Sequence, residues 1–372
     1  MAAQAALPQA DSSDQTISSP VAFVYVASAR GRDNNEIYAF AAALDGKLTP
    51  VSGSPFVGDV TSSMTANGKY IFGTNGVSIY SFSMASDGAL KKIAEINAQQ
   101  FNEYDCGGPV ALFVDRTGTT LYDEDYDGNE CANTDYQFFN IDDTTGQVSY
   151  AGATGASSVW FNVPVSFTGN NAYAYGSASY DYKPVVFGFK RTNEGKLTYM
   201  KVNPPMPAAQ KGDFYDPYGA AADSSDHVAI SVVPFNGSTG QQAGPPQLAT
   251  YTADGSGHLS TTSTYSNMPK TAVKNVTDLW MSPSGKLLAV GGTAGLEVFH
   301  FNGSNPITHY TGLLSTNQID QFFWDNSNHL YAISRSAGKL FVFNITPTSF
   351  SQAPGSPYLI TNPQSMIVVP EK

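Results

Sequence analysis

The sequence predicts an all-β protein, a seven-bladed β-propeller made of four-stranded antiparallel blades. Its composition favours strands and tight turns, with 34 Gly, 22 Pro, 21 Tyr and 22 Phe but only 13% charged residues in 372. An aromatic phrase also recurs at a spacing of roughly 50 residues, which is in the range of propeller blades. It occurs seven times, as EIYAF (36–40), SIYSF (78–82), DYQFF (135–139), VVFGF (185–189), QLATY (247–251), LEVFHF (296–301) and KLFVF (339–343).

Each repeat carries the signals for four short strands. Before six of the phrases a polar turn leads into an apolar strand, as in ANGKYIF (66–72) and SPSGKLLAV (282–290). After five of them a Gly-x-Leu or Gly-x-Val turn precedes another strand, as in GKLT (46–49) and GHLS (257–260). Turn signals at intervals of about 8–12 residues are typical of an all-β array. We therefore expect an inner strand, a second strand, the aromatic strand and an outer strand in each blade.

The two ends of the chain carry similar segments, LTPVSGSPF (48–56) and FSQAPGSPY (350–358), which we interpret as outer strands of the first and last blades. The first repeat lacks an inner strand, because FVYVAS (23–28) corresponds to a second strand. We expect PQSMIVVP (363–370) to fill this place and close the ring, which leaves few free sheet edges. The predicted organisation is a disordered lead-in over 1–21 and one domain over 22–370. Two domains are the alternative, but no segment between repeats resembles a linker.

The charge and hydropathy of the chain exclude several classes of function. The net charge is −12 and the 19 basic residues are scattered, which argues against a nucleic-acid partner. No apolar run approaches the roughly 20 residues needed to span a bilayer. The first 20 residues lack the basic and apolar regions of an intact signal peptide. We expect a monomer without a membrane span that requires no cofactor and takes a small molecule or a protein as its partner.

The segments FVYVAS, GKLTPVSGSPF, SPSGKLLAV and APGSPY resemble the seven-bladed propeller lactonases, the 6-phosphogluconolactonase family, in its secreted branch. The resemblance covers nearly all of 22–370 and implies the propeller fold and the hydrolysis of a sugar lactone. Members that open sugar lactones carry Pro-Arg-His where the fifth blade begins and another His in the fourth. This chain has Pro217-Tyr218-Gly219 and Trp160-Phe161-Asn162 at these places, so both expected histidines are absent.

Candidate site residues follow from the alternation of loops in a four-stranded meander. The crossings between blades and the loops between second and third strands share one face, where we expect a site. Opening a lactone needs a base and a group that stabilises the oxyanion. The candidates are Asp216 or Asp105 as base and Arg32, Lys274 or Arg335 as cation. Residues suited to sugar or peptide binding are Tyr180, Tyr182, Tyr215, Tyr218, Asp278 and Asp320. The alternative is that all of these are solvated loop residues and caps of strand ends.

Two further features concern metal binding and redox state. Asp123, Asp125 and Asp127 in DEDYDGNE (123–130) match the first half of an EF-hand-like calcium loop. Thr134 stands where the bidentate Glu belongs, so an acidic solvated loop is the alternative.

Cys106 and Cys131 are expected close together on one face, which predicts a disulfide and an extracytoplasmic compartment. Two free buried thiols are the alternative.

The five histidines have no partner at a spacing typical of a metal site or a catalytic triad, and we expect them to be structural. Two functions therefore stay open. One is an extracytoplasmic propeller that binds a ligand or partner without catalysis. The other is a lactone hydrolase with a divergent site, in which a carboxylate activates water.

Overall fold

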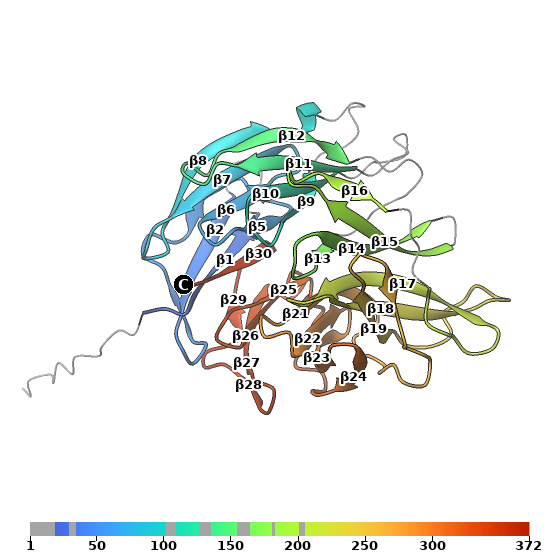
Figure 1. Ribbon diagram of the computed structural model, residues 1–372. Helices are drawn as coiled ribbons and strands as arrows, with labels where there is room; N and C mark the ends of the chain where they lie inside the picture. The colour runs from blue at the N-terminus through green and yellow to red at the C-terminus, as the bar shows by residue number, and fades with distance from the viewer. Residues whose placement is uncertain are drawn as a thin grey trace, which may run out of the picture.

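The computed structural model describes residues 19–29, 35–101, 109–125, 135–154, 164–180, 183–200 and 205–371. Across these ranges the strands form seven antiparallel sheets arranged as the blades of a propeller (Figure 1). The predicted all-β, seven-bladed fold is confirmed. Within the same ranges, no helix has the length and apolar character needed to cross a membrane.

The blades follow one another along the chain, and the strands within each blade run from the axis outwards. Blade 1 contains β30 (Pro363–Pro370), β1 (Ala22–Ser28), β2 (Glu36–Ala42) and β3 (Leu48–Pro50), with β4 (Phe56–Val57) also paired to β2. Blade 2 contains β5 (Met64–Ala66), β6 (Tyr70–Thr74), β7 (Ser78–Met84) and β8 (Leu90–Asn97), followed by the 3-10 turn η1 (Gln99–Phe101). Blade 3 contains β9 (Pro109–Val114), β10 (Thr120–Asp125), β11 (Asp135–Ile141) and β12 (Val148–Thr154).

The remaining blades repeat this order. Blade 4 contains β13 (Ser166–Phe167), β14 (Tyr173–Tyr180), β15 (Lys183–Arg191) and β16 (Leu197–Tyr199). Blade 5 contains β17 (Asp213–Ala222), β18 (His227–Asn236), β19 (Gln247–Ala253) and β20 (Leu259–Ser260). Blade 6 contains β21 (Val276–Met281), β22 (Leu287–Gly292), β23 (Gly295–Asn302) and β24 (Asn305–His309). Blade 7 contains β25 (Gln321–Trp324), β26 (His329–Ser334), β27 (Lys339–Ile345) and β28 (Phe350–Gln352), with β29 (Tyr358–Leu359) also paired to β27.

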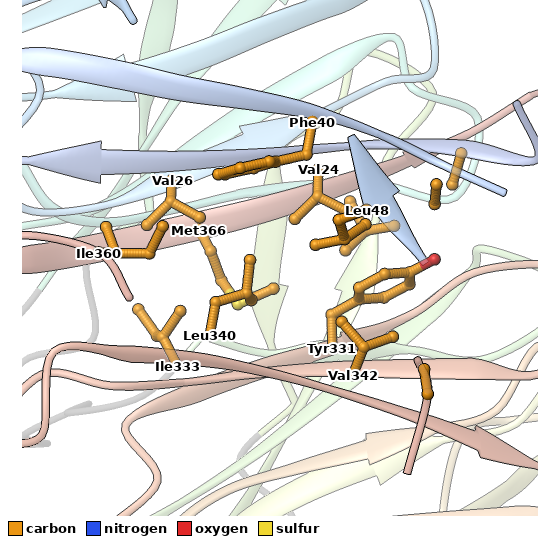
Figure 2. Packing of buried hydrophobic residues seen from close by; sticks show 14 residues of the cluster. Val24, Val26, Phe40, Leu48, Tyr331, Ile333, Leu340, Val342, Ile360 and Met366 are labelled. Carbon is orange, nitrogen blue, oxygen red and sulfur yellow. The ribbon is translucent and has the colours of Figure 1, made fainter. Parts of the chain in front are cut away.

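The ring closes as the sequence predicts. Strand β30 pairs with β1, so that Val368 lies opposite Val24, and the two ends of the chain share one sheet. Figure 2 shows the apolar cluster that joins blade 1 to blade 7, in which Phe40 and Val24 face Leu340. The outer segments differ in one detail from the prediction. Each is split into two short strands, β3 and β4 in blade 1 and β28 and β29 in blade 7, and both halves pair with the aromatic strand.

The aromatic phrases fill the spaces between blades. In all seven phrases the last aromatic side chain is at most 7% exposed. Tyrosines of the second strands add a repeated hydrogen bond between neighbouring blades, because their hydroxyls donate to carbonyls of the Gly-x-Leu turns. Tyr25 donates to the carbonyl of Gly88 at 2.9 Å, and Tyr175 donates to that of Gly257 at 2.7 Å. These turns therefore hold blades 2 and 5 against the blades that precede them.

Glycine is required in these turns for two reasons. Gly88 has a φ of +85°, in the left-handed region that favours glycine. A Cβ atom at this position would also overlap the ring of Phe23 in the neighbouring blade. Gly68 has a similar φ of +80°, but no atom lies within 4 Å of the place of its Cβ. Substitution at Gly68 therefore tests backbone strain alone, whereas substitution at Gly88 tests backbone strain together with the contact between blades.

We expect Gly88→Ala to destabilise the protein far more than Gly68→Ala. The strain of a left-handed residue is common to both and costs about 1–2 kcal/mol. In Gly88→Ala the displacement of Phe23 adds the cost of overpacking a core, about 1–3 kcal/mol. Urea unfolding of both variants measures the difference. Equal losses of unfolding free energy would mean that the contact with Phe23 has no energetic role.

Candidate functional site

Two neighbouring inner strands, β17 and β21, each present a carboxyl group beside an aromatic donor. The Tyr218 hydroxyl donates to Asp216 Oδ2 at 3.3 Å, and the Trp280 indole N–H donates to Asp278 Oδ2 at 2.8 Å. In both cases the donor is two residues beyond the acceptor, because residues i and i+2 of a strand point to the same side. We call these four residues the axis site, since the inner strands surround the axis of the ring.

The half of the axis site on β17 lies at a bulge, and β17 contacts β21, which carries the other half. The register between β17 and β18 shifts between Pro217 and Ala220, which is a bulge, and bulges re-aim side chains. Gly219 lies in this bulge with a φ of +79°, and a Cβ there would lie 2.8 Å from Leu279 Cδ1 of β21. The left-handed backbone favours glycine at this position. Tyr218 and Trp280 are 41% and 40% exposed, so solvent reaches both rings.

Burial raises the pKa of both carboxyl groups. It raises the pKa of Asp278 to about 7, although hydrogen bonds from the Trp280 indole and the Leu279 amide act in the opposite direction. Burial also raises the pKa of Asp216, and the hydrogen bond from Tyr218 partly opposes it. Asp216 Oδ1 is buried and accepts no hydrogen bond from the described residues. The axis site can thus hold or release a proton close to neutral pH.

The other predicted residues on this face occupy different surroundings. Tyr215 is 2% exposed and its hydroxyl donates to Gln247 Oε1 at 2.7 Å, so it packs in the core. The structure brings Asp320 and Arg335 together, because the Arg335 amide donates to Asp320 Oδ2 at 2.7 Å. The side chain of Arg335 is exposed. Lys274 is exposed on the crossing between blades 5 and 6.

Several predicted residues cannot be placed in a site. Arg32, Asp105, Tyr182, Asp127, Cys106 and Cys131 lie outside the described residues, and only the backbone of Tyr180 and Asp125 is described. Asp123 is a buried residue of β10. Among the residues that the structure describes, no group of three or more His, Cys, Asp or Glu could hold a metal ion. The calcium loop and the disulfide remain predictions.

The histidines have partners that the sequence analysis missed. The Nδ1 atoms of His227 and His329 lie 2.8 Å and 2.6 Å from carboxylate oxygens of Asp223 and Asp325, four residues earlier. The spacing Asp-x-x-x-His across a polar turn is the signal that could have shown these pairs. Trp280 was missed as well, although its alternation with Asp278 on an inner strand places both on one side.

No protein-family model matches the chain, and no curated protein matches it. Solved structures do match. A candidate 6-phosphogluconolactonase of Bacteroides fragilis has a TM-score of 0.63 at 15% identity, over 94% of this chain and 98% of that chain. The periplasmic gluconolactonase of Pseudomonas aeruginosa has a TM-score of 0.62 at 14% identity, over 94% and 99%. A protein of Lactobacillus plantarum has a TM-score of 0.62 at 12% identity, over 93% and 99%.

These likenesses concern the fold. The chain has the seven-bladed fold of the propeller lactonases, as the resemblance of its segments implied. Identities of 12–15% carry no site residues from one chain to the other, so function must be argued from the residues of this chain.

Proposed function

We propose that the protein is an extracytoplasmic binding protein that takes a neutral sugar or sugar lactone at the axis site. The supporting observation is the pairing of exposed aromatic rings, Tyr218 and Trp280, with the carboxyl groups of Asp216 and Asp278 on adjacent inner strands. Aromatic faces pack against the C–H groups of a sugar ring, while carboxyl oxygens accept hydrogen bonds from its hydroxyls. The predicted disulfide between Cys106 and Cys131 supports the extracytoplasmic location.

Hydrolysis of a lactone is the second candidate, and one observation favours it. A general base works best when its pKa is near the operating pH, and burial raises the pKa of Asp278 to about 7. Asp278 or Asp216 would then remove a proton from the water that attacks the lactone carbonyl. No hydrogen bond or ion pair among the described residues joins Lys274 or Arg335 to either carboxyl group. We place binding before hydrolysis because neither of these predicted cations is joined to the carboxyl groups of the axis site.

We expect binding of a neutral sugar to strengthen as the pH rises from about 6 to about 8. Asp278 loses its proton across this range, and an ionised carboxylate is the stronger acceptor for sugar hydroxyls. The gain should be about three- to tenfold in affinity. Tryptophan fluorescence with methyl β-D-glucoside and D-galactono-1,4-lactone measures it, because Trp280 lies in the site. Asp278→Asn should remove the pH dependence, whereas Asp254→Asn, at an exposed turn, should keep it.

Stability gives a second readout of the same carboxyl group. Its pKa is raised in the folded state, so the folded protein holds a proton that the unfolded chain releases. The wild-type protein should therefore lose stability as the pH rises from about 4 to about 7, by on the order of a few kcal/mol, and Asp278→Asn should not.

Failure of both ligands to change the fluorescence would reject binding at the axis site. Base consumption during incubation with the lactone, abolished by Asp216→Asn, would favour the hydrolase.

A further inference from the structure

A groove of about 370 Å³ lies between blades 5 and 6 and includes none of the axis-site residues. One wall comes from the loop between β18 and β19, through Gln242, Pro245 and Pro246. The other comes from the crossing segment that leads into β21, through Thr271, Ala272, Lys274 and Asn275. Its volume falls at the lower end of the range of small-molecule sites, which is about 300–1,000 Å³.

Backbone hydrogen bonds fix both walls of the groove. The Thr271 amide donates to the Pro246 carbonyl at 2.8 Å and joins one wall to the other. The Thr293 amide donates to the Asn275 carbonyl at 3.0 Å and ties the crossing segment to blade 6. Between these anchors Lys274 adopts a φ of +63°, a left-handed conformation that a non-glycine residue keeps only when its surroundings impose it. The groove is therefore already formed before any ligand binds.

Two polar groups in the groove lack protein partners among the described residues. Thr271 is 4% exposed, and its hydroxyl is buried without a hydrogen-bond partner in the part of the chain that the structure describes. A buried polar group left in this way is costly unless a ligand or water satisfies it. Lys274 carries its charge on the same wall, and it forms no ion pair with any described residue. Thr271, which carries this hydroxyl, and Lys274 both line the groove.

The charges around the groove favour an anion. The chain has a net charge of −12, so a small anion binds only where a local cation lacks an ion-pair partner, as Lys274 does among the described residues. Glu297 lies behind the wall, where its Oε2 accepts a hydrogen bond from the Ala272 amide at 2.9 Å. Its other oxygen is 3.7 Å from His309 Nδ1, and burial raises the pKa of Glu297. Both oxygens of this carboxyl group therefore have partners within the protein.

We propose that this groove is a second binding site and that its ligand is a small hydroxylated carboxylate, a sugar acid or similar hydroxy acid. Lys274 pairs with the carboxylate, and the Thr271 hydroxyl and the side-chain amides of Gln242 and Asn275 meet its polar groups. The rings of Pro245 and Pro246 cover its carbon chain. This proposal does not depend on the axis site, which would take a neutral ring compound.

Titration calorimetry of the full chain with D-gluconate, acetate and sorbitol tests the proposal. We expect gluconate to bind, acetate to bind more weakly and sorbitol not to bind, since only gluconate has both the charge and the hydroxyls. Lys274→Asn should weaken gluconate binding about tenfold or more, as expected for the loss of one charge-assisted hydrogen bond, because asparagine keeps the left-handed backbone. Thr271→Val, which keeps the shape of the side chain, should weaken binding several-fold.

Lys286→Asn is the matched control. Lys286 lies in the polar turn between β21 and β22 of blade 6 and does not line the groove, and its replacement changes the net charge by the same amount as Lys274→Asn. It should leave gluconate affinity unchanged, and thermal melting shows whether each variant is folded. Equal affinities for gluconate and sorbitol, or the same loss in Lys274→Asn and Lys286→Asn, would overturn the proposal. Loss of gluconate binding in Asp278→Asn with retention in Lys274→Asn would place the ligand at the axis site and reject the groove.

Discussion

A chain that ends at Asn362 should not fold into a stable propeller. It lacks β30, the inner strand of blade 1, in which the apolar side chains of 366–369 are at most 7% exposed. Burial of four such side chains contributes about 6–12 kcal/mol, at about 1.5–3 kcal/mol each. The whole stability of a folded protein is typically about 5–15 kcal/mol. Thermal melting by circular dichroism should show no cooperative transition, and the truncated protein should aggregate through the exposed edge of β1.

A chain that ends at Pro370 is the matched control. It keeps β30 and loses one described backbone hydrogen bond, from the Glu371 amide to the Val21 carbonyl at 2.9 Å. Its melting temperature should stay close to that of the full chain. A cooperative transition in the shorter chain, at the midpoint of the control, would contradict the structural role of ring closure.

The repeat architecture could be predicted from the sequence because each of its signals has a local physical cause. The glycine of the Gly-x-Leu turn is one example, since Gly88 combines a left-handed backbone with a close contact to the next blade. The apolar segments FVYVAS and PQSMIVVP are another, because both are buried strands of the same sheet. Such signals recur in most blades and reinforce one another, so the number of blades can be predicted even where one signal is missing.

The candidate site depends on features that no local signal shows. Tyr215 and Tyr218 lie in one predicted loop group, yet Tyr215 is buried and Tyr218 is exposed. Alternation along β17 places Tyr215 on the side opposite to Asp216 and Tyr218, and the packing of that side against the neighbouring strands buries it. The raised pKa of Asp278 results from burial in the folded protein. Burial in the folded ring, which the sequence does not show, thus decides which carboxyl groups have a raised pKa.

Asp325→Ala should be among the most destabilising single substitutions. The Asp325 side chain is fully buried and accepts hydrogen bonds from the Ser327 amide at 2.8 Å, the His329 amide at 2.9 Å and the Tyr331 hydroxyl at 2.9 Å. Its Oδ2 also lies 2.6 Å from His329 Nδ1. Alanine removes the acceptor shared by these groups, of which those of His329 and Tyr331 are buried. Loss of one partner of a buried polar network of this kind costs about 3–5 kcal/mol of unfolding free energy.

The network also crosses the boundary at which the ring closes, because His329 Nε2 lies 3.2 Å from the Leu44 carbonyl of blade 1. The chain offers a matched control in Asp254, which accepts hydrogen bonds from the Ser256 and His258 amides at 2.8 Å and 2.9 Å in a similar but exposed turn. Asp254→Ala keeps water available to the freed groups, so its unfolding midpoint in urea should change little. If Asp325→Ala shifted the midpoint no more than Asp254→Ala, burial would not be what makes the Asp-x-x-x-His turn of blade 7 important for stability.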